Sequence, residues 1–209
     1  MSAKAPVLGG LSVVVLAGGQ SRRMGADKAF LTLHGRPFIS LIVEEASKVS
    51  DDVIVMIGRK EESRFREAVG GAARVSADST YLTNPMGGIV SALPLVTNEY
   101  SAFLACDTPF VKADVIRLLW ESAKGRDAAV PAWEDGRIEP LCAVYSVAAL
   151  RVAIDRALAG NKQSLAEMIG LLRRVDFVKV DELREVDPDL QSFKNYNSRE
   201  EFDALKSKR

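Results

Sequence analysis

Ser12-Val13-Val14-Val15-Leu16-Ala17-Gly18-Gly19 is the stretch of sequence from which the fold can be predicted. Its β-branched run is typical of a strand that is buried on both faces, as in a parallel sheet covered by helices. The two glycines that follow end the strand in a loop. Because ligands of open parallel sheets bind beyond the carboxyl ends of the strands, this loop is the first candidate for a binding site.

The same alternation of strand and helix patterns continues along the chain. Apolar runs predict further strands over residues 52–57 and 101–106, and amphipathic spacing predicts helices over 37–49, 61–69, 88–96 and 113–124. This rhythm indicates parallel strands covered by helices. The chain has 209 residues, the length of one ordinary domain. We therefore expect an α/β fold: a single three-layer, Rossmann-like domain over residues 1–209 with a mostly parallel central sheet.

The pattern changes after Asp127. Residues 128–132 and 140–145 form two extended segments around the turn Glu134-Asp135-Gly136, which we expect to interrupt the parallel order. Helices are predicted over 147–159 and 164–172, and an extended segment over 174–180. Ser198 and Glu201 have the spacing of a capping box, which predicts a last helix toward Leu205.

The composition argues against several classes of protein. Twenty-eight basic residues balance twenty-eight acidic ones, so the chain lacks the overall positive charge of a nucleic-acid-binding protein. The apolar stretch over residues 7–19 is too short to span a bilayer and is a better match to a strand than to a secretory signal. Two cysteines, Cys106 and Cys142, predict neither a disulfide scaffold nor a zinc site. We expect a cytoplasmic protein without membrane contact, and His34 in an exposed turn.

The loop after the first predicted strand has the composition of a phosphate-binding loop. Glycines without side chains allow backbone N–H groups to approach an anion, and Arg23 and Lys28 add positive charge. The loop has neither the Lys-Ser/Thr of a P-loop nor the glycine spacing of a dinucleotide fingerprint. Glycine content alone is equally compatible with a flexible loop that carries two solvated basic residues.

The spacing within this loop favours binding. Residues 16–28 match every specified position of LAGGxSxRMGxDK, and the loop therefore resembles that of the molybdenum cofactor guanylyltransferases, or molybdopterin-guanine dinucleotide synthases, within the nucleotidyltransferase superfamily. The resemblance implies a nucleotidyltransferase domain in which Arg23 and Lys28 are catalytic. It also implies a nucleotide-binding set made of Leu16, Ala17, Gly18, Gly19 and Lys28.

A second segment resembles the same family. Asp78 precedes Asn84-Pro85-Met86-Gly87-Gly88, which is similar to the family's aspartate followed by Gly-Pro-Leu-Ala-Gly. The resemblance implies that Asp78 contacts the nucleotide; the alternative is an aspartate that caps a turn. Asn84 replaces the first glycine of the family's pattern.

Asp107 is the candidate metal ligand. It lies in the run Leu104-Ala105-Cys106-Asp107-Thr108-Pro109, directly after a predicted strand, and matches the family's Cys-Asp-x-Pro pattern. A carboxylate in this place can hold Mg²⁺ against a triphosphate, because this cation prefers oxygen ligands. We expect Asp107 to bind Mg²⁺ and the nucleotide and to take part in catalysis. Cys106 is expected to serve packing.

Two asparagines near the carboxyl end complete the resemblance. Asn195 and Asn197 match the family's Asn-x-Asn element before the last helix, which implies that they bind the acceptor; they could also satisfy backbone groups at a turn. Residues 140–145 resemble another family segment and are expected to line the acceptor pocket.

The resemblance implies that the chain transfers GMP from GTP to the terminal phosphate of molybdopterin or the molybdenum cofactor, with release of pyrophosphate. Delivery of the product to molybdoenzyme chaperones or cofactor-insertion proteins is compatible with this reaction. The family's asparagine after the second strand is absent from Val55-Met56-Ile57-Gly58, so base choice stays open. The alternatives are a molybdopterin cytidylyltransferase, a sugar-phosphate nucleotidyltransferase, and a noncatalytic adaptor that binds nucleotide or molybdopterin.

Overall fold

The protein is built around a seven-stranded sheet. The structure, a computed structural model, describes residues 7–19, 27–80 and 82–196. The strand order is β5-β4-β1-β6-β8-β7-β9. These strands are β1 (Leu11–Leu16), β4 (Asp52–Met56), β5 (Arg74–Ser76), β6 (Tyr100–Ala105), β7 (Ala128–Ala132), β8 (Cys142–Ser146) and β9 (Val175–Lys179).

The sheet is mostly parallel, as the sequence predicts. β1 pairs in parallel with β4 on one side and with β6 on the other, so that Leu16 lies opposite Met56 and Ala105. β8 is antiparallel to both β6 and β7, whereas β7 and β9 are parallel. The expected interruption after Asp127 is therefore confirmed, and it consists of the single reversed strand β8.

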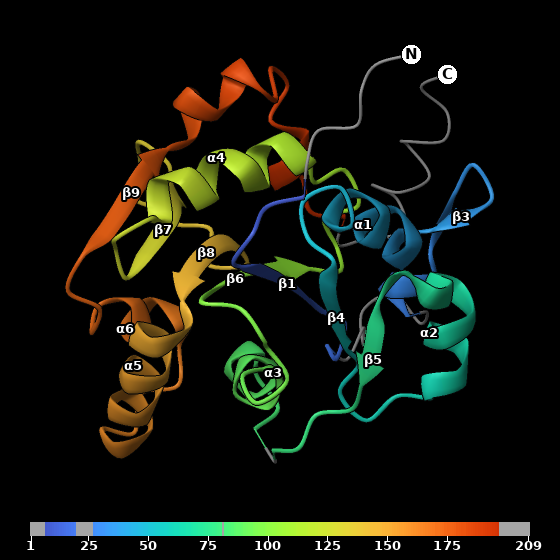
Figure 1. The fold of residues 1–209 in the computed structure, drawn as a ribbon, viewed down its shortest axis with the longest axis horizontal. Coiled ribbons are helices and arrows are strands. Elements are labelled where there is room, and N and C mark those ends of the chain that lie inside the picture. Colours follow the sequence, from blue (N-terminus) through green and yellow to red (C-terminus); the bar gives the residue numbers. More distant parts are fainter. Residues whose placement is uncertain (1–6, 20–26, 81, 197–209) are drawn as a thin grey trace.

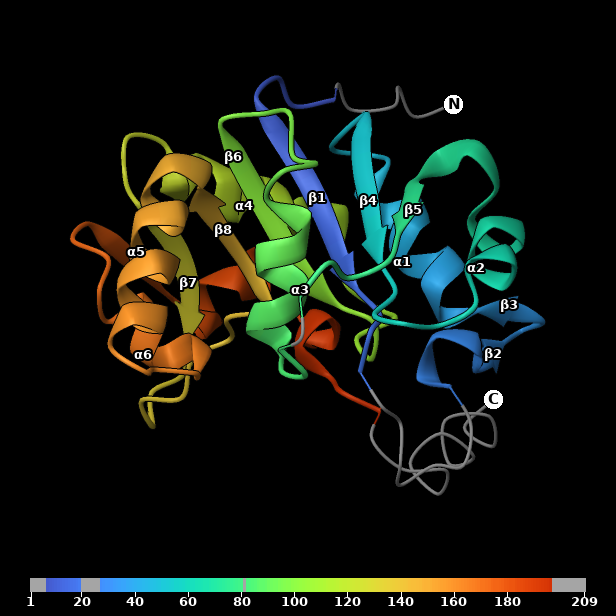
Figure 2. The ribbon, with the colours of Figure 1, turned by 90° about the horizontal axis from the view of Figure 1, so that it is seen from below.

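Helices cover both faces of the sheet (Figures 1 and 2). One face carries α1 (Phe38–Ala46), α2 (Glu62–Val69) and α4 (Ala113–Ala123); the other carries α3 (Pro85–Ala92), α5 (Val147–Ala159) and α6 (Leu165–Ile169). Successive side chains of β1 point to opposite faces of the sheet, so this strand contributes to the hydrophobic core on each face. Val13 and Val15 pack with the first group of helices, and Val14 packs with the second. The predicted three-layer α/β architecture is confirmed.

Several boundaries differ from the prediction. The helix predicted over 88–96 begins at Pro85, because the Asn84 side chain accepts a hydrogen bond from Gly87 N (3.2 Å) and proline suits the first helical turn. The helix predicted over 164–172 ends at Ile169, although its capping box of Ser164 and Glu167 is present. The predicted helix toward Leu205 lies outside the described residues.

Short elements are the ones that periodicity does not predict. They are β5, the small hairpin of β2 (Thr32–Leu33) and β3 (Arg36–Pro37), and the 3-10 turns η1 (Lys28–Phe30), η2 (Gly70–Ala72), η3 (Val180–Glu185) and η4 (Gln191–Phe193). His34 lies at the exposed tip of the small hairpin with φ 51°, which confirms the turn expected there. In the described ranges, no helix has the length and apolar character needed to cross a membrane.

Asp52 ties together the end of the sheet that lies away from the glycine loop. Its carboxylate accepts hydrogen bonds from the hydroxyls of Ser12 (2.6 Å) and Thr97 (2.7 Å) and from Arg74 (2.5 Å). Burial by itself would raise the pKa of Asp52, but these hydrogen bonds outweigh it and hold the pKa below its ordinary value.

Replacing Asp52 by Asn is expected to lower the free energy of unfolding by about 1–3 kcal/mol at neutral pH. The folded-state pKa is lower than the unfolded-state value of about 3.9, so the carboxylate stabilises the fold above that value. This contribution is lost as the pH falls through the folded-state pKa. Urea unfolding should therefore show a difference between wild type and D52N at pH 7 that shrinks in acid. The exposed neighbour Asp51 provides the control D51N, and equal losses in both variants would contradict the assignment.

Candidate functional site

The carboxyl ends of three parallel strands bring the predicted site residues to one edge of the sheet. β1 leads into Ala17-Gly18-Gly19, β4 into Ile57-Gly58, and β6 into Cys106-Asp107. Backbone hydrogen bonds continue past the strands, from Ala17 N to the carbonyl of Met56 (2.7 Å) and from Cys106 N to the carbonyl of Leu16 (3.2 Å). The three loops therefore start from fixed positions relative to one another.

Gly18 lies against Gly58 at this edge. A Cβ atom on Gly18 would lie 2.8 Å from the backbone nitrogen of Gly58, and Gly58 itself has φ +66°. Around Gly19, by contrast, no described residue other than its chain neighbours comes within 4 Å of the place that a Cβ atom would take. The absence of a side chain at Gly18 is therefore required by contact between two loops, a reason that the sequence does not reveal.

Asp78 is held to the same place by two backbone hydrogen bonds. Its carboxylate accepts from Gly58 N (3.1 Å), and its own N–H donates to the carbonyl of Gly58 (2.9 Å). Burial raises the pKa of Asp78, and the hydrogen bond from Gly58 opposes this only in part. A Cβ on Gly88, in the first turn of α3, would lie 3.1 Å from Leu16 and 3.8 Å from the Asp78 carboxylate. Leu16, Gly18 and Asp78 thus lie around one region next to α3.

Lys28 and Asp107 form an ion pair across the edge. The ammonium nitrogen of Lys28 lies 3.2 Å from a carboxylate oxygen of Asp107, and both side chains are only partly exposed. The Asp107 loop is shaped by Thr108, whose hydroxyl donates to the carbonyl of Ala105 (2.9 Å). The pair places a cation and a carboxylate side by side, which is the combination needed to hold a phosphate and its metal ion.

Lys60 is a second lysine at the loop, and it lies outside the motifs that predict the site. Its ammonium donates to the carbonyl of Ala17 (2.6 Å) and to the carboxylate of Asp27 (2.8 Å). Asp27 in turn caps η1, the 3-10 turn that carries Lys28, by accepting from Ala29 N (3.2 Å). Lys60 therefore connects the start of the glycine loop to its end. Its place two residues after Gly58 is the only trace of this role in the sequence.

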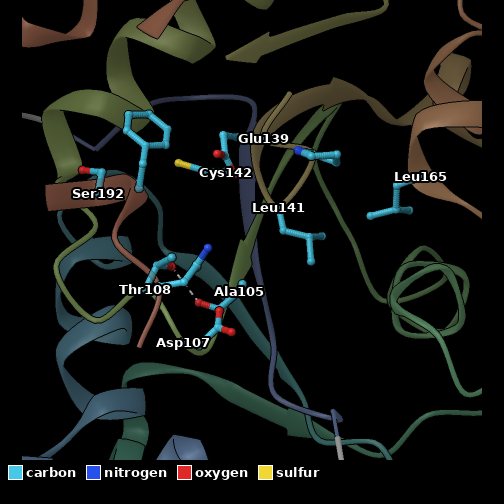
Figure 3. Close-up of a pocket in the computed structure, with 11 residues that line it drawn as sticks. Ala105, Asp107, Thr108, Glu139, Leu141, Cys142, Leu165 and Ser192 are labelled. Carbon is cyan, nitrogen blue, oxygen red and sulfur yellow. Dashed lines mark hydrogen bonds between the residues drawn. The ribbon is translucent and has the colours of Figure 1, made fainter. Parts of the chain in front are cut away.

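A pocket opens on the other side of Asp107. Its volume is about 260 Å³, and it is lined by Ala105, Asp107, Thr108, Glu139, Pro140, Leu141, Cys142, Leu165, Ser192, Phe193 and Asn195 (Figure 3). The segment 140–145, expected to line an acceptor pocket, thus contributes its first three residues. Burial, together with the neighbouring Asp107 carboxylate, raises the pKa of the Cys106 thiol to about 12, which fits the packing role expected for Cys106.

The segment that carries Asn195 is held at the pocket by a buried carboxylate. Asp187 lies 2.8 Å from the ammonium of Lys112 and accepts from Ser192 N (2.7 Å), while Lys112 N donates to the Ser192 hydroxyl (3.0 Å). Burial alone would raise the pKa of Asp187, but these contacts outweigh it and the pKa is lowered. Tyr196 N then donates to the carbonyl of Asp107 (3.1 Å), which places Asn195 beside the metal-ligand candidate.

The described residues suit a cation that binds mainly through phosphate and water. Among them, no cluster of three or more His, Cys, Asp or Glu side chains is placed to hold a metal. Mg²⁺ does not need one, because it usually keeps several waters and is bound by one or two carboxylates with substrate phosphates. Asp107 offers such a carboxylate, with 24% of its side chain exposed.

The structure brings eight predicted site residues to this edge and leaves two outside the described ranges. The eight are Leu16, Ala17, Gly18, Gly19, Lys28, Asp78, Asp107 and Asn195. Arg23 and Asn197 lie outside the described residues, so their predicted roles stay predictions. Lys60, Lys112, Glu139 and Asp187 are the additions that only the spatial arrangement reveals.

Comparison with known proteins identifies relatives over nearly the whole chain. The family described as "MobA-like NTP transferase domain" matches residues 13–175. A probable molybdenum cofactor guanylyltransferase of Methanosarcina acetivorans is 36% identical over 93% of this chain and 89% of its own length. A molybdenum cofactor guanylyltransferase of Desulfosudis oleivorans is 35% identical over 93% of both chains.

Solved structures show the same fold. Molybdopterin-guanine dinucleotide biosynthesis protein A from Archaeoglobus fulgidus superimposes with a TM-score of 0.76 at 27% identity, over 92% of this chain and 95% of that one. A 2-C-methyl-D-erythritol 4-phosphate cytidylyltransferase from Thermus thermophilus reaches 0.62 at 18% identity, over 80% of this chain and 88% of that one. The second similarity concerns the fold alone.

The contact between Gly18 and Gly58 predicts unequal effects at two adjacent glycines. Gly18→Ala should lower the free energy of unfolding by roughly 1–3 kcal/mol, because the new methyl group meets the backbone of Gly58. Gly19→Ala is the matched control, since its methyl group would lie more than 4 Å from the described residues other than its chain neighbours. Thermal and urea unfolding measure both, and equal stability of the two variants would show that the two loops do not need this close approach.

Proposed function

The chain belongs to the MobA-like NTP transferase family, and from that membership we propose that this nucleotidyltransferase moves GMP from GTP to the terminal phosphate of molybdopterin. A phosphate oxygen of molybdopterin attacks the α-phosphorus of GTP, pyrophosphate leaves, and molybdopterin guanine dinucleotide forms. The names of the relatives from M. acetivorans and D. oleivorans support this reaction. Handover of the product to a cofactor-insertion protein in the cytoplasm is part of the same proposal.

The observation that carries the proposal is the Lys28–Asp107 pair between two binding regions. On one side lie the glycine loop and Asp78, and on the other lies the pocket with Asn195. A nucleotide bound along the glycine loop has its phosphates near Lys28, and an acceptor in the pocket reaches the same point. The pair therefore lies where the two substrates must meet.

For this reaction the protein must position the two substrates and neutralise the charge of their phosphates. The attacking phosphate is already largely ionised near neutral pH, so no strong general base is required, and the obstacle is the mutual repulsion of two polyanions. Lys28, and Arg23 by resemblance, neutralise charge on the transferred and leaving phosphates. Asp107 would hold Mg²⁺, which supplies further charge neutralisation when bound. Asn195, with Asn197 by resemblance, would orient the acceptor.

The backbone groups of Leu16 and Ala17, which we propose to recognise the base, already form hydrogen bonds within the protein. Of the backbone groups expected to contact the base, the carbonyl of Leu16 accepts from Cys106, Ala17 N donates to Met56, and the carbonyl of Ala17 accepts from Lys60. A carbonyl has two lone pairs and can accept a second hydrogen bond, whereas an N–H has no second proton to donate. Guanine, whose edge offers N1–H and the 2-amino group as donors, suits these two carbonyls.

Pyrophosphate release in the presence of molybdopterin and Mg²⁺, measured separately with GTP, CTP, ATP and UTP, tests the proposal. We expect release with GTP alone. Release with CTP alone would make the protein a cytidylyltransferase, and release only after a sugar phosphate replaces molybdopterin would change the acceptor. Binding of nucleotide or molybdopterin without release of pyrophosphate would identify a noncatalytic adaptor.

Removing the Lys28 ammonium should slow turnover without a matching loss of nucleotide affinity. In Lys28→Ala we expect kcat to fall by about 10²–10³, the typical effect of deleting one group that stabilises transition-state charge. Lys124→Ala, at the exposed end of α4, is the control for the loss of a positive charge. Normal turnover of K28A at saturating GTP and molybdopterin would rule out the electrostatic role of Lys28.

A further inference from the structure

The pocket contains a second carboxylate that the proposed reaction does not use. Asp107 is paired with Lys28, whereas Glu139 forms no salt bridge in the described part of the chain. The two side chains lie at different ends of the pocket, with Leu141 and Leu165 among the residues between and beside them (Figure 3). The pocket is therefore polar at both ends and partly apolar along its sides.

Glu139 is held in place by contacts on its side chain and its backbone. One carboxylate oxygen accepts a hydrogen bond from the indole N–H of Trp133 (2.7 Å). Glu139 N donates to the carbonyl of Pro131 (2.9 Å), and its own carbonyl accepts from Cys142 N (3.2 Å). Trp133 packs edge-to-face against Phe193, which also lines the pocket. The carboxylate is thus oriented before any ligand arrives, and its other oxygen has capacity to accept hydrogen bonds.

The negative charge of Glu139 decides which part of an acceptor can lie next to it. The carboxylate of Glu139 acts on Cys142, which also lines the pocket. The pKa of the Cys142 thiol is raised to about 12, mainly by burial and further by the negative charges of Glu139 and Asp187. A phosphate next to Glu139 would be repelled by a charge of the same sign. A neutral group that presents several N–H donors would be attracted, and a partly buried carboxylate binds such a group strongly.

We propose that Glu139 recognises the pterin ring of the acceptor by accepting hydrogen bonds from its N3–H and 2-amino group. This inference rests on the proposed function, because it assigns the two ends of molybdopterin to the two ends of the pocket. The terminal phosphate then lies at Lys28 and Asp107, and the flat ring lies along Leu141 and Leu165 with its donor edge at Glu139. A volume of about 260 Å³, slightly below the roughly 300–1,000 Å³ of drug-sized sites, suits a bicyclic ring.

Steady-state kinetics of Glu139→Gln provide the main test. The amide keeps the size of the side chain but offers only one acceptor atom, and its NH₂ group meets a donor of the pterin. We expect KM for molybdopterin to rise about tenfold to a hundredfold, the usual cost of losing a charge-assisted hydrogen bond. KM for GTP and the Mg²⁺ dependence should stay unchanged. Glu134→Gln is the matched control, because Glu134 is exposed in the adjacent turn.

Direct binding of two phosphate-free rings tests the same assignment without turnover. Equilibrium dialysis compares pterin with lumazine, which carries an oxygen in place of the 2-amino group. The wild type and E134Q should prefer pterin, whereas E139Q should lose or reverse this preference, because the Gln NH₂ can donate to the lumazine oxygen. Trp133→Phe keeps the contact with Phe193 but removes the hydrogen bond to Glu139, and it should weaken the preference by a smaller factor.

The outcomes separate this inference from the proposed function. If the wild type transfers GMP to molybdopterin and E139Q shows an unchanged KM for molybdopterin, the role of Glu139 is wrong and the proposed function stands. A change confined to the Mg²⁺ dependence would assign Glu139 to the metal and would also overturn the inference. If the wild type transfers to no pterin, the proposed function fails, and equal binding of pterin and lumazine by wild type and E139Q would then remove the inference as well.

Discussion

The carboxyl end of β1 is fixed from both sides, and the candidate site is built outward from it. Parallel pairing with β4 and β6 continues one residue past the strand, so that the backbones at Ala17 and Cys106 start from set positions. The first free turn then brings Gly18 within contact of Gly58. A side chain at Gly18 would push the β1 and β4 loops apart, and Asp78 would move with Gly58 because two hydrogen bonds join them. The arrangement of Gly18, Gly58 and Asp78 therefore depends on one close backbone contact.

Charge at this edge is arranged in local pairs within a chain whose formal net charge is zero. Lys28 is paired with Asp107, and Lys60 with Asp27. The two pairs differ in what surrounds them, since Lys60 also donates to the carbonyl of Ala17 and so stabilises the loop itself. Lys28 borders the pocket through Asp107, and in the proposed reaction Lys28 would bind phosphate while Asp107 would hold a cation. One lysine thus shapes the loop, and the other lies next to the pocket, where the proposed reaction would bring the substrates together.

The pattern of apolar residues and turn residues along the sequence predicted the features that depend on neighbouring residues. The valine run predicted β1, the alternation predicted a covered parallel sheet, and the Asp135-Gly136 turn predicted the reversed strand β8. The glycine loop was also recognised, but Gly18 was explained by anion binding alone, whereas its steric reason is Gly58, forty positions away. Lys60 and Glu139 were not predicted as site residues for the same reason. Nothing in the sequence around them shows that Lys60 reaches the glycine loop or that Glu139 lines the pocket. Such roles arise from contacts between distant segments, which periodicity does not report.

The pocket is assembled differently from the region of the glycine loop. The loops at Gly18 and Gly58 directly follow the neighbouring strands β1 and β4, whereas the pocket also uses a segment from near the carboxyl end of the chain. That segment is held by Asp187, a fully buried carboxylate whose partners Lys112 and Ser192 come from the α4 entrance and from η4. A buried charge without partners is costly, so these contacts favour the packing of the segment against the α4 entrance. This packing places Asn195 next to Asp107, so the pocket is formed by residues from both halves of the chain.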